Sequence, residues 1–143
     1  EIHRVLRGGG VFSAIVDGEM DSAPGYRAVH DLIYGRVQRV CPAYGRFDLG
    51  DARVRNSEAL VELASRTFGD AEVRVEPSVL YLDDDPVALA REAAGFFYAA
   101  FVLAPDDRAE MLDDLAELLR AQSGEIPTFA MPVNRLLVVR SPA

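Results

Sequence analysis

The fold of this chain is decided by the stretch EIHRVLRGGGVFSAIVDG at residues 1–18. Its first seven residues carry apolar side chains at helical spacing, and the triplet Gly8–Gly10 ends the helix, because glycine adopts positive-φ conformations cheaply. Residues 11–16 form a near-continuous apolar run closed by Asp17 and Gly18, which is typical of a strand covered on both faces. The stretch therefore predicts a helix end, a sharp reversal and a central strand of an α/β sheet.

Outward from this stretch, helical and strand patterns alternate along the chain. Asn56 or Ser57 can cap a helix, since its side-chain oxygen would accept the free amide hydrogens of the first turn. Alternating apolar residues before an acidic turn at 83–86 predict a second strand. In chain order we expect a crossover region or lid at 19–50 with a weakly helical stretch at 26–40, a helix at 57–68, a strand at 73–82, helices at 87–102 and 105–122, and a strand at 131–140.

Length and composition limit the class of protein. The chain has 143 residues, half of them hydrophobic, so we expect residues 1–143 to form a single domain or part of one. The net charge of −8 disfavours a nucleic-acid partner. The longest apolar stretch, 99–104, is far too short to cross a membrane. The single cysteine, Cys41, excludes an intrachain disulfide, and we expect a cytoplasmic protein.

The first ten residues, EIHRVLRGGG, followed by an apolar strand, carry a resemblance to a known family. They resemble the segment before the fifth strand of class I S-adenosylmethionine-dependent methyltransferases. The usual string there is an acidic residue, an apolar one, Arg-Val-Leu, a basic residue and Pro-Gly-Gly. Gly8 stands where the family has proline, which makes the turn more flexible without changing its course.

The resemblance implies a fold for the whole chain. It is similar to the C-terminal half of a Rossmann-like methyltransferase sheet, with strands 5, 6 and 7 at 11–16, 73–82 and 133–140. In that family the seventh strand inserts antiparallel between the fifth and the sixth. A helical insertion at about 86–125 would sit where some small-molecule methyltransferases carry extra helices.

The resemblance also implies where the cofactor would bind. In that family a glycine-rich loop after the first strand and an acidic residue after the second strand hold S-adenosylmethionine, and both lie upstream of the matched region. Gly8–Gly10 precedes a strand and does not open a helix, so it is not such a loop. We therefore expect S-adenosylmethionine in a parent protein and no cofactor-binding residue in this chain, whose start at Glu1 without methionine suggests an upstream segment.

Candidate acceptor-site residues follow the strand at 11–16. His30 could act as a general base toward a hydroxyl acceptor, although a solvated surface histidine has the same sequence pattern. Tyr26, Tyr34 and Tyr44 lie in the same region, and rings with one polar edge suit a pocket for a partly apolar molecule. The alternative is that these rings pack a lid against the sheet.

A second aromatic group occurs in the expected helix at 87–102. Phe97 and Tyr98 are candidates for a wall of the acceptor pocket, and Phe97 and Phe101 would lie one turn apart on the same helix face. Core packing or a partner interface is the alternative for this cluster, because aromatic residues at helical spacing usually serve burial.

No metal site is expected from the sequence. Asp83, Asp84 and Asp85 form an acidic turn, yet no ligand set with binding-loop spacing accompanies them. We expect a solvated turn.

Two functions of different classes agree with this sequence. The resemblance implies part of a methyltransferase that acts on a small molecule, with this segment supplying the acceptor pocket and a lid, and we expect the segment alone to be inactive. The alternative is a non-catalytic α/β module that covers the exposed edge of the strand at 11–16 by forming a homodimer, a strand-swapped dimer or a complex with another chain.

Overall fold

The computed structural model describes residues 1–44, 51–124 and 126–142. By its internal contacts the chain divides into two compact units. We call them the sheet unit (Glu1–Ser22, Gly50–Leu80 and Pro132–Ala143) and the helical unit (Ala23–Leu49 and Tyr81–Met131). Residues 45–50 of the expected lid and residue 125 of the expected insertion lie outside the described residues.

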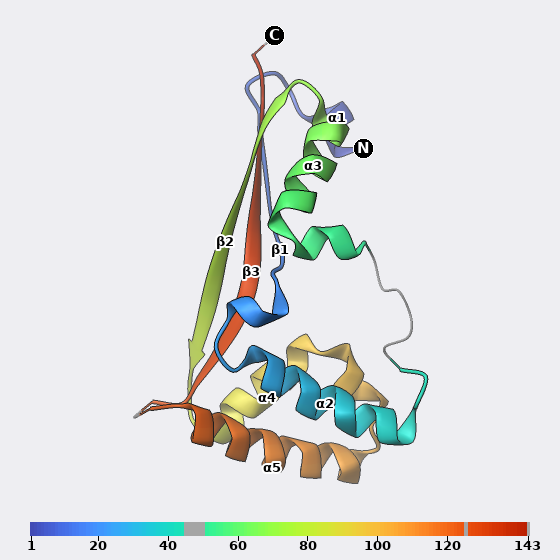
Figure 1. The fold of residues 1–143 in the computed structure, drawn as a ribbon, viewed down its shortest axis with the longest axis vertical. Coiled ribbons are helices and arrows are strands. Elements are labelled where there is room, and N and C mark those ends of the chain that lie inside the picture. Colours follow the sequence, from blue (N-terminus) through green and yellow to red (C-terminus); the bar gives the residue numbers. More distant parts are fainter. Residues whose placement is uncertain (45–50, 125, 143) are drawn as a thin grey trace. The chain divides into compact units, whose positions relative to one another are not determined.

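Three strands form one sheet, so the predicted α/β class is confirmed (Figure 1). The strands are β1 (Val11–Asp17), β2 (Ala71–Asp83) and β3 (Thr128–Arg140), in the order β1-β3-β2. Strand β3 pairs antiparallel with β1, from Val11 opposite Val139 to Asp17 opposite Val133, and it also runs opposite to β2. The last strand of the chain therefore lies antiparallel between the other two, the order that the resemblance implies.

The expectation that β1 is covered on both faces is wrong for the described structure. Residues 12, 14 and 16 of β1 are half-buried, but Val11 and Ile15 on the other face are 58% and 64% exposed. The reason is that helix α3 (Ser57–Phe68) packs on one face, where Leu60, Ala64 and Phe68 form a core with residues of β3. An apolar run in the sequence gives the composition of a strand but not the elements that cover it.

The start of α3 is fixed by hydrogen bonds that satisfy its free amides. The side chain of Asn56 accepts from the amide of Ala59 at 2.9 Å, which confirms the predicted cap. Behind it, the buried side chain of Asn134 on β3 accepts from the hydroxyl of Ser57 and donates to the carbonyl of Arg55, both at 3.1 Å. This buried amide ties the helix start to the middle strand, and nothing in the sequence pattern indicates it.

The glycine triplet forms the predicted reversal between α1 (Ile2–Val5) and β1. Gly9 has a φ of +73°, a conformation that favours glycine. The amide of Gly10 donates to the carbonyl of Arg7 at 2.8 Å, and the amide of Gly9 donates to the carbonyl of Arg140 at 3.0 Å. The turn is therefore closed on itself and joined to the end of β3.

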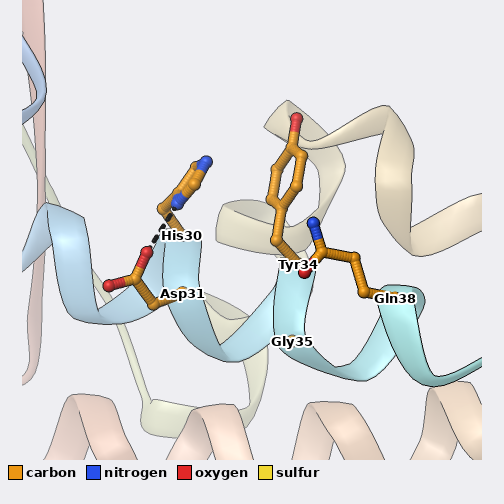
Figure 2. A pocket seen from close by; sticks show the side chains of 5 residues that line it. All are labelled: His30, Asp31, Tyr34, Gly35 and Gln38. Atoms are coloured by element: carbon orange, nitrogen blue, oxygen red, sulfur yellow. Dashed lines mark hydrogen bonds and ion pairs between the residues drawn. The ribbon is translucent and has the colours of Figure 1, made fainter. Parts of the chain in front are cut away.

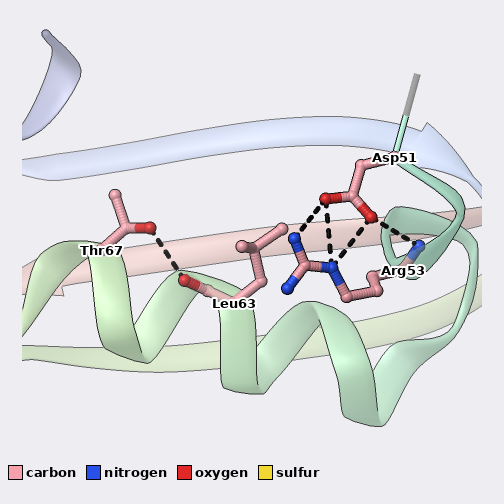
Figure 3. Close-up of polar contacts among 4 residues, drawn as sticks. All are labelled: Asp51, Arg53, Leu63 and Thr67. Atoms are coloured by element: carbon pink, nitrogen blue, oxygen red, sulfur yellow. Dashed lines mark hydrogen bonds and ion pairs between the residues drawn. The ribbon is translucent and has the colours of Figure 1, made fainter.

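A short 3-10 helix, η2 (Ala52–Arg55), precedes α3, and its N-cap Asp51 forms an ion pair with Arg53 (Figure 3). The carboxylate of Asp51 accepts from the backbone amide of Arg53 at 3.0 Å and from its guanidinium at 2.9 Å. These bonds, the side-chain bond first, lower the pKa of Asp51 from 3.8 to about 2. Farther along α3, the hydroxyl of Thr67 donates to the carbonyl of Leu63.

The helical unit packs four elements around one core. They are α2 (Tyr26–Val40), α4 (Pro86–Phe96), the 3-10 helix η3 (Tyr98–Val102) and α5 (Pro105–Gln122). Helix α2 contributes Val29, Ile33 and Val37, four residues apart and fully buried. The expected lid and the expected insertion at about 86–125 thus contribute to a single core, a connection that the sequence does not reveal.

An ion-pair group joins α2 to α5. The guanidinium of Arg36 bonds the carboxylate of Asp114 and lies 3.5 Å from that of Glu110. The bond to Asp114 is the main cause that raises the pKa of Arg36 above its ordinary value. The pair is thus a polar contact between α2 and α5 beside their apolar core.

The expected helix at 87–102 is not continuous, which corrects the prediction. Helix α4 ends at Phe96, and Phe97 adopts an extended conformation before η3 begins. The guanidinium of Arg108 donates to the carbonyls of Ala100 and Leu103, both at 3.2 Å, and so supports this tighter path. No helix among the described residues is long and apolar enough to cross a membrane.

Replacing Gly18 by alanine should destabilise the sheet unit. A Cβ at this position would lie 2.9 Å from both the carbonyl carbon of Pro132 and the amide nitrogen of Val133. Because backbone atoms cannot move aside cheaply, we expect a loss of ~1–3 kcal/mol in the free energy of unfolding, measured by urea denaturation. The matched control is Gly95→Ala in α4, where a Cβ meets nothing within 4 Å and a gain of ~0.5–1 kcal/mol is expected.

Replacing Arg53 by glutamine should raise the pKa of Asp51 from about 2 back toward 3.8. Since the pKa is lower in the folded state, the pair stabilises the fold above pH 3.8, and this contribution is lost as the pH falls from 3.8 through 2. Carboxyl ¹³C NMR titration measures the shift directly. An unchanged Asp51 titration in Arg53→Gln would refute the assignment, and Arg74→Gln, which removes an exposed pair with Glu72, should leave Asp51 unchanged.

Candidate functional site

Five aromatic side chains of the helical unit come together around Phe97. We call this group the aromatic cluster, and it consists of Tyr26, His30, Tyr34, Tyr44 and Phe97. The ring centroid of Phe97 lies 5.7 Å from that of Tyr26, 6.0 Å from that of His30 and 6.3 Å from that of Tyr34. Tyr44 contacts the cluster through Tyr34, whose ring centroid lies 5.9 Å from its own. These distances are those of aromatic rings in contact.

Helix α2 places three of these rings by its periodicity. Tyr26, His30 and Tyr34 are four residues apart, so they follow one another along one face of the helix. The neighbouring face carries the fully buried residues Val29 and Ile33. Helix α2 is therefore anchored by one face while the adjacent face holds the aromatic rings in a row.

His30 has a fixed hydrogen bond and a fixed stacking partner (Figure 2). Its Nδ1 lies 2.9 Å from Oδ1 of Asp31, and its ring stacks on that of Tyr34 with centroids 4.2 Å apart and planes 20° apart. An ionised carboxylate only accepts hydrogen bonds, so the contact assigns a hydrogen to Nδ1, and in the neutral tautomer the lone pair is then on Nε2. The pair Asp31 and His30 thus presents a hydrogen-bond acceptor at Nε2.

A surface hollow of about 410 Å³ lies beside this histidine. Its lining comes entirely from α2 and consists of His30, Asp31, Tyr34, Gly35 and Gln38. The amide nitrogen of Gln38 donates to the carbonyl of Tyr44 at 3.2 Å, which orients the side chain. The hollow combines an apolar ring surface with a few polar groups in fixed positions, the usual composition of a small-molecule site.

The structure brings together five of the six predicted site residues. His30 and Tyr34 line the hollow, whereas Tyr26 and Tyr44 support the row of rings. Phe97 is only 7% exposed, so it packs under the rings and does not form an open wall. Tyr98 is 80% exposed on η3 and lies outside the aromatic cluster.

The predicted pairing of Phe97 with Phe101 on one helix face is wrong. The helix ends at Phe96, so Phe97 turns into the core while Phe101 is 61% exposed, with the guanidinium of Arg108 5.3 Å from its ring centroid.

Three further residues near the site were not predicted as site residues from the sequence. Asp31 and Gln38 lie on the same helix as His30, and their spacing of one and eight residues from it was a readable signal. Phe129 in β3 contacts the rings of Tyr26 and Phe96 at 6.0 and 6.1 Å, and no sequence pattern connects these distant segments.

A second hollow of about 470 Å³ lies elsewhere in the helical unit. Its lining residues are Pro24, Gly25, Tyr81, Gln122, Ser123, Gly124, Thr128 and Ala130. Two of its polar groups already have partners, since the hydroxyl of Thr128 donates to Asp83 at 2.7 Å and that of Ser123 donates to the carbonyl of Leu119 at the same distance.

The acidic turn has structural roles. Asp85 caps α4 by accepting from the amides of Val87 and Ala88, and Asp83 accepts from Thr128. Among the described residues, no group of three or more histidine, cysteine, aspartate or glutamate side chains is arranged to hold a metal ion.

The amides of the glycine triplet are used within the fold. Those of Gly9 and Gly10 both donate to backbone carbonyls of the sheet unit, so the triplet serves the turn.

Comparison with known proteins adds no assignment. No protein-family model matches the chain, and no curated protein sequence matches it.

Replacing Phe97 by alanine should destabilise the helical unit by ~3–5 kcal/mol, because it removes a buried ring on which three others pack. Replacing its neighbour Tyr98, which is 80% exposed, by alanine should change the free energy of unfolding by less than ~0.5 kcal/mol. Urea denaturation followed by far-UV circular dichroism measures both. Equal effects of the two substitutions would contradict the assigned positions of these rings.

Proposed function

We propose that this chain is the acceptor-binding, C-terminal part of a class I S-adenosylmethionine-dependent methyltransferase that acts on a small molecule. The observation that carries the proposal is the strand order β1-β3-β2, with the last strand antiparallel between the other two. The resemblance of the first ten residues to that family implies this order. A sheet order and a sequence motif are independent features, so their agreement supports the proposal more than either does alone.

The division of the chain into units supports the assigned role. Methyl transfer requires alignment of the acceptor and exclusion of water more than a dedicated catalytic triad. The helical unit supplies a hollow with oriented groups beside His30, and it derives from the two segments that follow β1 and β2. In this proposal the helical unit binds the acceptor, and a part of the parent protein outside this chain binds S-adenosylmethionine.

The proposed setting is the cytoplasm, and the proposed partner is a small molecule. A single cysteine agrees with a reducing compartment, and a net charge of −8 disfavours binding to nucleic acid.

A second candidate function is a non-catalytic module that pairs with another chain. The observation that favours it is β1, which has only β3 beside it among the described strands and exposes Val11 and Ile15. An apolar strand with a free edge is a template for pairing, either with a second copy or with another part of a parent protein.

Calorimetric titration with S-adenosylmethionine, combined with intact mass, tests the two candidates. The native gene product is compared with the 143-residue chain. We expect a native product heavier than 15.6 kDa that binds S-adenosylmethionine, and no binding by the 143-residue chain. Binding by the 143-residue chain would overturn the assignment of the cofactor site to another part of the protein.

Two further outcomes of this experiment favour the second candidate. One is a native product of 15.6 kDa that does not bind S-adenosylmethionine, and the other is a heavier product that also fails to bind it. Sedimentation at high concentration then decides between the forms of the module, because a strictly monomeric chain contradicts pairing through β1.

A further inference from the structure

We propose that the hollow on α2 binds a planar aromatic compound that carries a neutral hydroxyl group, with the hydroxyl donating to Nε2 of His30. The proposal rests on the proposed function only in naming this compound as the class of methyl acceptor. Binding itself requires no cofactor and can be measured on the 143-residue chain.

The first step of the argument is the state of His30. The bond from Nδ1 to Asp31 assigns the hydrogen to Nδ1 and the lone pair to Nε2. The structure gives Nε2 no hydrogen-bond partner among the described residues, and the side chain is 23% exposed. A ligand that meets the neutral form of this ring donates a hydrogen bond to Nε2, as a hydroxyl group does.

The second step is the shape of the ring surface. The rings of His30 and Tyr34 lie nearly parallel, with 20° between their planes, and Phe97 meets each of them edge-on. Phe97 thereby packs against both members of the stacked pair. A rigid row of rings favours a flat ligand, because such a ligand gains aromatic contact without ordering the site.

The third step is the space that Gly35 leaves. Gly35 lies one residue after Tyr34 and lines the hollow, and a Cβ built there meets nothing within 4 Å. The absence of a side chain keeps the hollow open between the ring pair and Gln38. A larger side chain at this position would occupy the ligand's place without disturbing the packing of α2.

The fourth step is charge. Asp31 places a carboxylate on the wall of the hollow, and the chain as a whole carries a net charge of −8. Both oppose an anionic ligand, since its desolvated charge would lie near another negative charge. The observations therefore favour a neutral phenol over a carboxylate of the same shape.

The experiment compares 4-methylphenol with three related probes. The probe 4-methylphenol has the ring and the donor, 4-methylanisole lacks the donor, 4-methylcyclohexanol lacks the aromatic ring, and 4-methylbenzoate carries a negative charge in place of the donor. Binding is followed by ¹⁵N and ¹H NMR of the two histidine rings. His3, in the sheet unit, is the internal control, and its signal is assigned with the variant His3→Gln.

We expect 4-methylphenol to shift the Nε2 signal of His30 saturably and to leave His3 unchanged. The other three probes should bind at least ~3–10-fold more weakly, the factor expected for one lost hydrogen bond or, for 4-methylcyclohexanol, for the lost aromatic contact. In Asp31→Asn the hydrogen should redistribute between the two ring nitrogens, seen in the ¹⁵N chemical shifts, and the preference for 4-methylphenol over 4-methylanisole should decrease.

Matched variants separate binding from folding. Gly35→Met should abolish the shift while the protein remains folded, because methionine fits a helix better than glycine and meets no clash at its Cβ. Gly95→Met, at a helical glycine outside the hollow, should leave binding unchanged.

Three results would overturn the proposal: equal binding of 4-methylphenol and 4-methylanisole, an unchanged His30 shift in Gly35→Met, or no shift at millimolar 4-methylphenol. These results are distinct from failure of the proposed function. Phenol binding in a native product that does not bind S-adenosylmethionine would keep the site and reject the methyltransferase. Binding of S-adenosylmethionine without phenol binding would do the reverse.

Discussion

Strand β3 is the element on which the sheet unit depends, because both other strands hydrogen-bond to it and neither pairs with the other. Its buried Asn134 also fixes the start of α3, and its last residue, Arg140, bonds the carbonyls of Leu6 and His3. The pair Val11 and Val139 is separated by almost the whole chain. The sheet therefore closes over a long loop, whose entropy must be offset before any of these contacts forms.

The sequence predicted the positions of the three strands, but not which faces of the sheet are covered by helices. All three strands lie where alternation and turn residues place them, and Asn56 caps α3 as expected. The strand order was predicted only through the resemblance, since residue patterns carry no information on which strands pair. The exposure of Val11 and Ile15 was not predicted, because an apolar strand looks the same whether a second layer lies on it or not.

In the candidate site, too, the local features could be predicted from the sequence, and the contacts between distant segments could not. The row of Tyr26, His30 and Tyr34 follows from helical spacing, and the bond between His30 and Asp31 joins neighbours in the chain. The contact of these rings with Phe97 could not be predicted, because more than 60 residues separate the segments. The error at Tyr98 has a local cause: a single extended residue at Phe97 ends the helix and turns the next ring outward.

The two faces of helix α2 thus have different roles. The buried face, with Val29, Ile33 and Val37, positions the helix through contacts with distant segments, and the outer face lines the hollow. A change at the exposed residues Gly35 and Gln38 of the outer face costs little stability, because neither belongs to the core, whereas His30 and Tyr34 on the same face contact the buried ring of Phe97. Under the proposed function, substitutions at these exposed positions would change which ligand the hollow prefers, while the rings packed on Phe97 keep its shape.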